Sequence, residues 1–273
     1  MFLIKFISMK LYKNLKLILT KKELSLMPRS FEVVGDILIF SRFPKQLKKR
    51  EKIIGNKILS LLNNIKVVCI KDGKHFGKYR TNKIKIIAGD KRKTTLHKEN
   101  NVLIKVDVEK CYFSPRLSTE RLRISSLVKN EDVLVMFSGV GIYCLILAKN
   151  AKQVYGIEVN PTAHKYALEN LKLNKINNVK LIKGDVRKVL PKLKFDRIIM
   201  PLPKDAYKFL DLALKAIKKN GIIHLYDFED EKEIYKVVEK IQAKVKKFKV
   251  LNIVKCGQFG VRKYRICVDF KVL

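Results

Sequence analysis

Apolar positions in the first part of the chain follow the short, regularly interrupted pattern of β-strands. Between Pro28 and about Tyr112, strand-like runs occupy residues 31–40, 66–71, 83–89 and 101–108. Short apolar or alternating runs that are bounded by turn residues are typical of strands. One segment among them, residues 45–62, has apolar residues at helical spacing. The pattern therefore predicts a small, strand-rich α+β domain over residues 28–112, preceded by an amphipathic arm of residues 1–27.

From Phe113 onward, strand-like and helix-like segments alternate. The predicted strands are residues 132–137, 153–159, 179–185, 195–200, 221–228 and 262–273. The predicted helices are residues 142–150, 161–173 and 205–218. Strands and helices that alternate at this spacing form right-handed βαβ units and a mainly parallel sheet. We therefore predict an α/β chain in which a Rossmann-like, doubly wound domain of residues 113–273 follows the small α+β domain.

The charge of the chain points to a polyanionic partner. Sixty Lys and Arg residues stand against 25 Asp and Glu residues, which gives a net charge of +35. Self-repulsion of this size opposes compaction, and a nucleic acid would relieve it. A lysine-rich proteome or a charge-rich thermophilic surface would give the same bias. The domain of residues 28–112 holds 21 Lys or Arg against 8 Asp or Glu, so we expect it to contact RNA or DNA.

Other bulk features exclude several classes of protein. Hydrophobic residues make up 47% of the chain, which is enough for a folded core. The longest unbroken apolar run, residues 142–148, is far shorter than the ~20 residues that cross a bilayer. Lysines interrupt the apolar N-terminus, unlike a signal peptide. The five cysteines form no C-x-x-C pair. We expect a cytoplasmic protein without membrane span, disulfide framework or metal.

The predicted strand of residues 132–137 ends in a glycine turn, where ligands of doubly wound sheets bind. Gly139 and Gly141 allow the backbone to approach a ligand closely. The next two strands end at Glu158 and Asp185, carboxylates suited to ribose hydroxyls and to an adenine amino group, although each alone also suits a helix N-cap. No complete pyrophosphate-binding pattern is present, which favours S-adenosylmethionine. The predicted cofactor-binding residues are Phe137, Gly139, Gly141, Glu158, Val159, Asp185, Val186 and Pro201.

Longer segments resemble the archaeal and eukaryotic tRNA methyltransferases that act on N1 of guanine 37, beside the anticodon. The resemblance covers about residues 20–273 and is carried by residues 26–37, 88–100, 111–124, 136–143, 156–178 and 200–214. Its most specific part is the run YFSPRLSTER, residues 112–121, which the glycine-loop strand follows about a dozen residues later. The resemblance implies a class I, S-adenosylmethionine-dependent enzyme whose partner is tRNA.

The resemblance also implies roles for individual residues. Glu120 corresponds to the general base, which accepts the N1 proton as the methyl group arrives. Arg80 corresponds to the arginine that faces guanine O6 and stabilises developing charge. Tyr112 corresponds to an aromatic residue at the target base, and the loop that begins at Pro201 shapes the base pocket. The predicted RNA contacts are Arg80, Arg116, Arg121 and Lys204.

The chain departs from the family pattern in three respects. Val135 stands where family members usually have Asp, and Pro201 stands where the pocket loop often begins with Asn. We expect these changes to affect cofactor affinity without removing Glu120 or Arg80. About 25 residues precede the segment 26–37, fewer than the extra N-terminal domain of many family members needs. We therefore expect recognition of the tRNA to rest on the anticodon stem and loop. We also expect a monomer.

The predicted function is methyl transfer from S-adenosylmethionine to N1 of guanine 37 in tRNA. One alternative is a wyosine-pathway enzyme that transfers the aminocarboxypropyl group or methylates a wyosine intermediate. Another is a catalytically silent tRNA-binding relative. Plainer interpretations of single residues also stay open: a surface pair of Glu120 and Arg121 on a helix, Arg80 as one phosphate contact among many, and Tyr112 in the core. His97 and His224 are expected to be structural.

Overall fold

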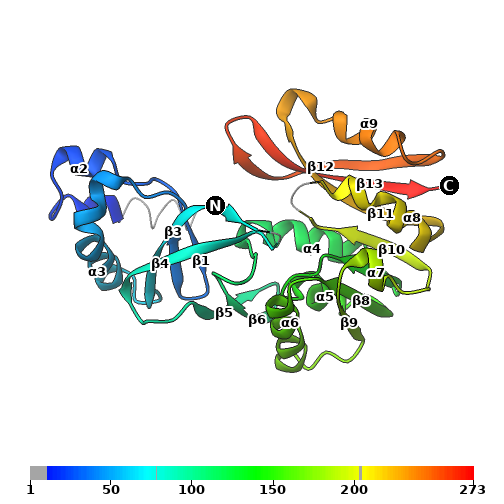
Figure 1. Cartoon of the computed structure of the whole chain (residues 1–273), viewed down its shortest axis with the longest axis horizontal. Helices are drawn as coiled ribbons and strands as arrows, with labels where there is room; N and C mark the ends of the chain where they lie inside the picture. Colours follow the sequence, from blue (N-terminus) through cyan, green and yellow to red (C-terminus); the bar gives the residue numbers. More distant parts are fainter. Residues whose placement is uncertain (1–10, 78, 203–204) are drawn as a thin grey trace. The chain divides into compact units, whose positions relative to one another are not determined.

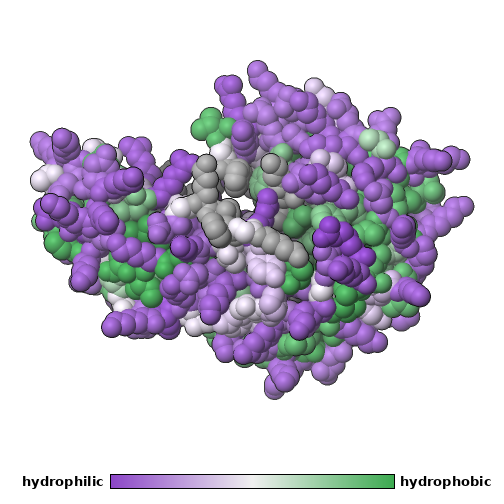
Figure 2. Space-filling model, in the orientation of Figure 1, coloured by the Kyte–Doolittle hydropathy of each residue, from purple (hydrophilic) through white to green (hydrophobic). Residues whose placement is uncertain are grey.

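The computed structural model describes residues 11–77, 79–202 and 205–273 (Figure 1). The chain divides into two compact units. The first comprises the described residues up to Lys98 together with Lys105–Pro115, and the second comprises Glu99–Ile104 and Arg116–Leu273. Among the described residues, no helix has the length and apolarity that a membrane crossing would require. Hydrophilic side chains cover most of the visible surface, as the many lysines and arginines require (Figure 2).

The first unit is built on a four-stranded sheet in the order β1-β2-β3-β4. Its strands are β1 (Phe31–Val34), β2 (Ile37–Phe40), β3 (Val67–Phe76) and β4 (Thr81–Gly89). The pair β2–β3 is parallel and the other two pairs are antiparallel. The 3-10 helix η1 (Lys45–Arg50) and the helix α3 (Glu51–Leu61) connect β2 to β3, where a helix was predicted. Residues 11–15 are helical, and the short helix α2 (Lys21–Ser25) follows.

Residues 31–40 were predicted as one strand, and this prediction was wrong. They form the hairpin β1–β2, whose turn contains Gly35 at a φ of +54°. A Cβ at Gly35 would lie 2.1 Å from Thr95 Oγ1, so only glycine fits both the backbone angle and the space. The turn was missed because buried apolar residues, Val34 and Ile37, flank it directly on both sides.

A two-stranded hairpin of β5 (Thr94–Glu99) and β6 (Val102–Asp107) follows. Asn100 and Asn101 join the strands with φ values of +46° and +62°. Positive φ at both turn residues is the geometry of a tight hairpin turn that asparagine tolerates. Strand β6 was predicted, whereas β5 was not. The tip of the hairpin, Glu99–Ile104, groups with the second unit.

The second unit contains a seven-stranded sheet in the order β12-β13-β11-β10-β7-β8-β9. Its strands are β7 (Asp132–Met136), β8 (Gln153–Glu158), β9 (Val179–Lys183), β10 (Phe195–Met200), β11 (Ile217–Asp230), β12 (Phe248–Gly260) and β13 (Lys263–Val272). The pairs from β11 to β9 are parallel, whereas β13 runs antiparallel to both β11 and β12. This is the predicted doubly wound, Rossmann-like sheet with an antiparallel edge.

Helices connect and cover this sheet (Figure 1). They are α4 (Ser118–Leu127), α5 (Ile142–Leu147), α6 (Pro161–Leu173), α7 (Val186–Val189), α8 (Leu210–Ala216) and α9 (Lys236–Gln242), with 3-10 helices η2 (Pro115–Leu117), η3 (Ala206–Phe209) and η4 (Glu231–Glu233). The helix predicted over residues 205–218 is thus η3 followed by α8, and it ends at Ala216 because β11 begins at Ile217. Strand β12 and helix α9 were not predicted.

The position of β7 decides where a ligand is expected. It lies between β10 and β8, so the chain leaves it toward one side of the sheet and later returns on the other. In doubly wound sheets ligands bind at the carboxyl ends of the strands that flank such a switch point. Leu134 and Met136 of β7 are fully buried and pack in the main core of the unit, which fixes the strand that carries the glycine loop.

Candidate active site

The loop after β7 has an unusual backbone. Phe137 has a φ of +64°, a conformation that is strained for a bulky side chain, and its ring packs edge-to-face on Phe209 with centroids 5.0 Å apart. Gly139 and Gly141 also have positive φ, and Gly141 is the N-cap of α5. A Cβ at Gly141 would lie 3.1 Å from Ala167 Cβ. Backbone strain that the sequence maintains at one turn is typical of a functional site.

Glu158 lies against this loop, at the carboxyl end of β8. Its carboxylate accepts hydrogen bonds of 2.7 Å from the backbone N–H groups of Gly139 and Asn160. Only 8% of the residue is exposed, and this burial raises the pKa of Glu158 despite those hydrogen bonds. The structure therefore brings together two residues that the sequence predicted for cofactor binding, Gly139 and Glu158.

Asp185 follows the next strand, β9, and caps α7. Its carboxylate accepts a hydrogen bond of 3.0 Å from the backbone N–H of Arg187 and one of 2.9 Å from the Arg187 side chain. The preceding residue, Gly184, donates its N–H to the Glu158 carbonyl at 2.9 Å. Glu158 and Asp185 thus stand at the ends of adjacent strands. Val159 is half-buried, whereas Val186 is buried in the core.

These residues fit an adenosyl ligand. Acceptors stand at the ends of β8 and β9, and a glycine turn lies at the end of β7 beside them. The hydroxyl Oγ of Ser138, between Phe137 and Gly139, is buried and has no hydrogen-bond partner among the described residues. A buried hydroxyl without a partner is costly, so a polar ligand group would stabilise it.

Glu120 is buried in the first turn of α4, with an exposure of 4%. Arg123 donates to its carboxylate from Nε at 2.7 Å and from Nη2 at 2.8 Å. The Tyr226 hydroxyl donates to Oε1 at 2.6 Å, and it accepts a hydrogen bond of 3.1 Å from the Tyr143 hydroxyl. Tyr143 stands in the first turn of α5, two residues after Gly141. Two tyrosine side chains therefore join Glu120 to the helix that the glycine loop opens.

Arg123 connects Glu120 to a larger buried network that the sequence did not predict. Arg123 also donates to Asp269, at 2.6 Å from Nη1 and 3.2 Å from Nη2. Asp269 lies 2.6 Å from His224 Nδ1. On the far side, Arg197 Nη1 lies 2.7 Å from His224 Nε2, and Glu131 accepts from Arg197 at 2.5 and 2.9 Å. His224 was expected to be structural, and it occupies the middle of this network.

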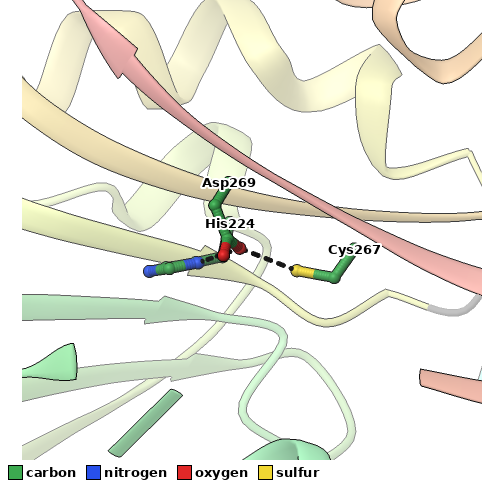
Figure 3. Close-up of side chains that lie close together, drawn as sticks. All are labelled: His224, Cys267 and Asp269. Carbon is green, nitrogen blue, oxygen red and sulfur yellow. Dashed lines mark hydrogen bonds and ion pairs between the residues drawn. The ribbon is translucent and has the colours of Figure 1, made fainter. Parts of the chain in front are cut away.

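His224, Cys267 and Asp269 are also residue types that bind metals, and their ligand atoms lie within 4.8 Å of one another (Figure 3). Their geometry suits hydrogen bonding better. Cys267 Sγ donates to Asp269 Oδ1 at 3.2 Å, the same oxygen that faces His224. The positive Arg197 side chain occupies the other nitrogen of His224. Burial raises the pKa of Cys267 well above its usual value, so the thiol keeps its proton.

Another arginine fixes the start of the loop after β10. Arg265 of β13 donates from Nη2 to the backbone carbonyl of Pro201 at 2.8 Å. Its guanidinium lies 5.0 Å from the centre of the Tyr226 ring. The side chain is almost fully buried, and its Nε has no partner among the described residues. The backbone at Pro201, the first residue of this loop, is thereby held in place.

The remaining predicted residues are distributed as follows. Arg80, with a φ of +53°, and Tyr112 are half-buried in the first unit. Arg116 is exposed. Arg121 is 2% exposed and donates two hydrogen bonds of 2.6 Å to Glu99. An RNA contact through Arg121 would require this ion pair to open. Lys204 lies outside the described residues.

Burial of Glu120 and Arg121 also excludes the plainer interpretation of the two as an exposed pair on a helix. Arg123, Tyr226, Asp269 and Arg265 were missed. A sequence signal for Arg123 existed, since it stands three residues after Glu120 on the same helical face. Tyr226, Asp269 and Arg265 carry no local signal, because they reach the site only through strand pairing.

Comparisons with known proteins agree with this architecture. A family model described as the TRM5/TYW2 methyltransferase domain matches residues 95–253, and one described as the TYW2 N-terminal domain matches residues 11–93. The tRNA (guanine(37)-N(1))-methyltransferase Trm5b of Pyrococcus abyssi is 42% identical over 252 residues, covering 90% of this chain and 76% of that protein. The tRNA (guanine(37)-N(1))/4-demethylwyosine(37)-methyltransferase Taw22 of Nanoarchaeum equitans is 34% identical, covering 89% and 100%.

Solved structures give the same answer. The structure of aTrm5 in complex with tRNALeu matches with a TM-score of 0.86 and 35% identity, covering 94% of this chain and 76% of that one. The structure of TYW2 of M. jannaschii in complex with AdoMet matches with a TM-score of 0.67 and 30% identity, covering 89% and 100%. The predicted fold and family resemblance are thus confirmed. The chain belongs to the TRM5/TYW2 methyltransferase family.

Proposed function

We propose that this protein transfers a methyl group from S-adenosylmethionine to N1 of guanine 37 in tRNA. The observation that carries the proposal is the placement of Glu120. Its buried carboxylate is fixed by Arg123 and Tyr226, and through Tyr143 it is linked to the helix that follows the glycine loop. The relatives named as guanine-37 methyltransferases cover most of this chain and support the same activity.

The residues around the glycine loop would hold the cofactor. Glu158 would accept the ribose hydroxyls, Asp185 would accept the adenine amino group, and the backbone at Gly139 and Gly141 would allow close contact. When bound, S-adenosylmethionine supplies a methyl group, whose bond to sulfur breaks as its bond to guanine N1 forms. The pair Glu158–Gly139 is already formed in the structure, so this part of the site needs little rearrangement.

Glu120 would act on the target base. The N1 atom of guanine carries a proton that must leave as the new bond forms, and a carboxylate held in one orientation is a suitable acceptor. The N1–H bond breaks and an O–H bond forms on Glu120. The family resemblance assigns Arg80 to guanine O6 and Tyr112 to the target base, and we retain both assignments as part of the proposal. Extrusion of a base from a single-stranded loop costs only a few kcal/mol.

The basic residues would hold the RNA. We assign the tRNA contacts mainly to the domain of residues 28–112, with the arm of residues 1–27 before it and the catalytic domain of residues 113–273 after it. Lysine and arginine side chains that contact phosphates supply affinity with little sequence information. The proposed partner is the anticodon stem and loop, the proposed state is a monomer, and the proposed compartment is the cytoplasm. Arg116, one of the predicted RNA contacts, is exposed.

Nucleoside analysis of a treated tRNA transcript tests the activity. The purified protein, S-adenosylmethionine and a transcript with guanine at position 37 should yield 1-methylguanosine. A matched transcript with adenine at position 37 should yield none. The proposal fails if calorimetry shows that the protein binds S-adenosylmethionine but the guanine transcript stays unmodified. That outcome would indicate a silent tRNA-binding relative.

A wyosine-pathway activity is the second candidate. The relative from Nanoarchaeum equitans is named for methylation of both guanine 37 and 4-demethylwyosine. Incubation with tRNA that contains 4-demethylwyosine distinguishes the outcomes by mass. A mass gain of one methyl group, or of one aminocarboxypropyl group, on that nucleoside alone would replace the first candidate.

A further inference from the structure

The buried network behind Glu120 has a directed arrangement. From the carboxylate of Glu120 it runs through Arg123 to Asp269 and then to His224, with every neighbour within 2.6–2.8 Å at its shortest contact. The first two residues stand on α4, whereas His224 and Asp269 face each other on the paired strands β11 and β13. We propose that Arg123 is a positioning residue for Glu120, and that Asp269, oriented by His224, fixes Arg123. This inference rests on the proposed role of Glu120.

The guanidinium of Arg123 lies between two carboxylates. It uses Nε and Nη2 toward Glu120 and uses Nη1 and Nη2 toward Asp269. The side chains of Glu120 and Asp269 are 3% and 4% exposed, and that of Arg123 is 23% exposed. A planar guanidinium that binds carboxylates on two edges has little rotational freedom. The orientation of the Glu120 side chain is therefore fixed by β13, through Arg123, as well as by its own helix.

The hydrogen bonds to Glu120 distinguish its two oxygens. Tyr226 and Arg123 Nη2 both donate to Oε1. Among the residues that the structure describes, Oε2 accepts only from Arg123 Nε. Oε2 thus keeps a lone pair in a defined direction, and it is the oxygen that we assign to the N1 proton.

The protonation state of His224 follows from its two neighbours. Arg197 can only donate, so His224 Nε2 must accept and the ring proton must be on Nδ1. Nδ1–H then donates to Asp269, which keeps that carboxylate ionised and turned toward Arg123. Burial lowers the pKa of His224, in agreement with a neutral ring. Burial raises the pKa of Asp269, but the hydrogen bonds from His224 and Arg123 outweigh it, and the net pKa is lowered.

A double-mutant cycle tests the inference. The variants are Glu120→Gln, Arg123→Lys and their combination, with Asp269→Asn as a second route to the same effect. Lysine keeps the charge of Arg123 but loses its planar fork. Single-turnover methylation of the guanine-37 transcript should slow about 100-fold in Arg123→Lys, the cost of a displacement of about 1 Å. In the Glu120→Gln background the same change should slow the reaction by less than about threefold, since residues that act as a unit are not additive.

A matched control separates positioning from general stability. Lys218 also lies between two carboxylates, 2.8 Å from Asp196 and 3.8 Å from Asp132. All three stand at the amino ends of their strands, the edge of the sheet opposite the glycine loop. Lys218→Gln should leave the single-turnover rate within about twofold of the wild type. Cofactor affinity by calorimetry and the unfolding midpoint are measured for every variant, and rates are measured well below each midpoint.

The outcomes distinguish failure of the proposed role of Glu120 from failure of the positioning role of Arg123. A wild-type rate in Glu120→Gln overturns the proposed function of that residue and this inference with it. A slow Glu120→Gln together with a wild-type rate in both Arg123→Lys and Asp269→Asn overturns the inference alone. If Arg123→Lys slows the reaction by the same factor in the wild-type and Glu120→Gln backgrounds, the inference is also overturned, because the effect of Arg123 would then not act through Glu120. If Arg123→Lys does not fold, the cycle is completed with Asp269→Asn, which removes one charge without changing size.

Discussion

Replacement of Glu120 by Gln is the most direct test of the chemistry. Glutamine has nearly the same size and keeps one oxygen acceptor, but it cannot accept a proton at neutral pH. Loss of a general base slows a reaction by about 10²–10⁴-fold, which corresponds to about 3–5 kcal/mol of transition-state stabilisation. We expect a decrease of this size in the single-turnover rate, with the affinity for tRNA little changed because we assign the phosphate contacts to other residues.

The structure also gives the cost of this variant in stability. Both oxygens of Glu120 accept from Arg123, so either orientation of the glutamine places its NH2 group against a guanidinium N–H. At least one charge-assisted hydrogen bond is lost, at about 1.5–3 kcal/mol. The free energy of unfolding, measured with urea, should decrease by this amount. The fold should persist, because Asp269 still pairs with Arg123.

Glu99→Gln is the matched control for Glu120→Gln. Glu99 is also a buried glutamate of the second unit, and each of its oxygens accepts a hydrogen bond of 2.6 Å from Arg121. We expect a similar loss of stability and a methylation rate close to that of the wild type. The reasoning is refuted if Glu120→Gln stays within threefold of the wild-type rate, or if Glu99→Gln slows the reaction as much as Glu120→Gln does.

Three further changes have defined outcomes. Arg265→Met removes the donor to the Pro201 carbonyl and should lower kcat/KM for methylation about tenfold. A wild-type kcat/KM would show that this contact is dispensable. Replacement of several lysines of residues 45–93 by Gln should weaken tRNA binding and flatten its salt dependence, and an unchanged slope would place the RNA elsewhere. Gly35→Ala forces a Cβ to within 2.1 Å of Thr95 and should lower the unfolding free energy by at least about 2 kcal/mol, whereas an equally stable variant would contradict the turn geometry.

Sequence patterns predicted those helices and strands whose boundaries are set by residues within or next to the element. Helix α6 begins at Pro161 and ends at Leu173 as predicted, because Asn160 caps it and proline at its first position favours that start. The five parallel strands were all predicted from short apolar or alternating runs. Four of them lie inside the sheet and are largely buried, which is typical of strands covered on both faces, whereas β9 lies at the edge of the sheet and alternates more strongly. Strand β12 was missed because it is an edge strand with mostly exposed or half-buried residues, so no apolar run marks it.

The same division applies to the candidate site. Gly139, Glu158 and Asp185 follow successive parallel strands, so alignment of the strands brings them to one edge of the sheet. The partners of Glu120 are different. Tyr226 is 106 residues away from it along the chain, and no spacing rule relates the two. Val135 is fully buried in β7, and its expected effect on cofactor affinity stays a prediction.

The antiparallel strand β13 (Lys263–Val272) carries the side chains on which the proposed positioning of Glu120 depends. It carries both Asp269 and Arg265, and its register with β11 places Asp269 opposite His224. A shift of the register by one residue would turn Asp269 to the other face of the sheet and leave Arg123 with one carboxylate. A parallel sheet alone would position the cofactor residues. Only the added antiparallel pairing gives Glu120 the second anchor that we assign to it.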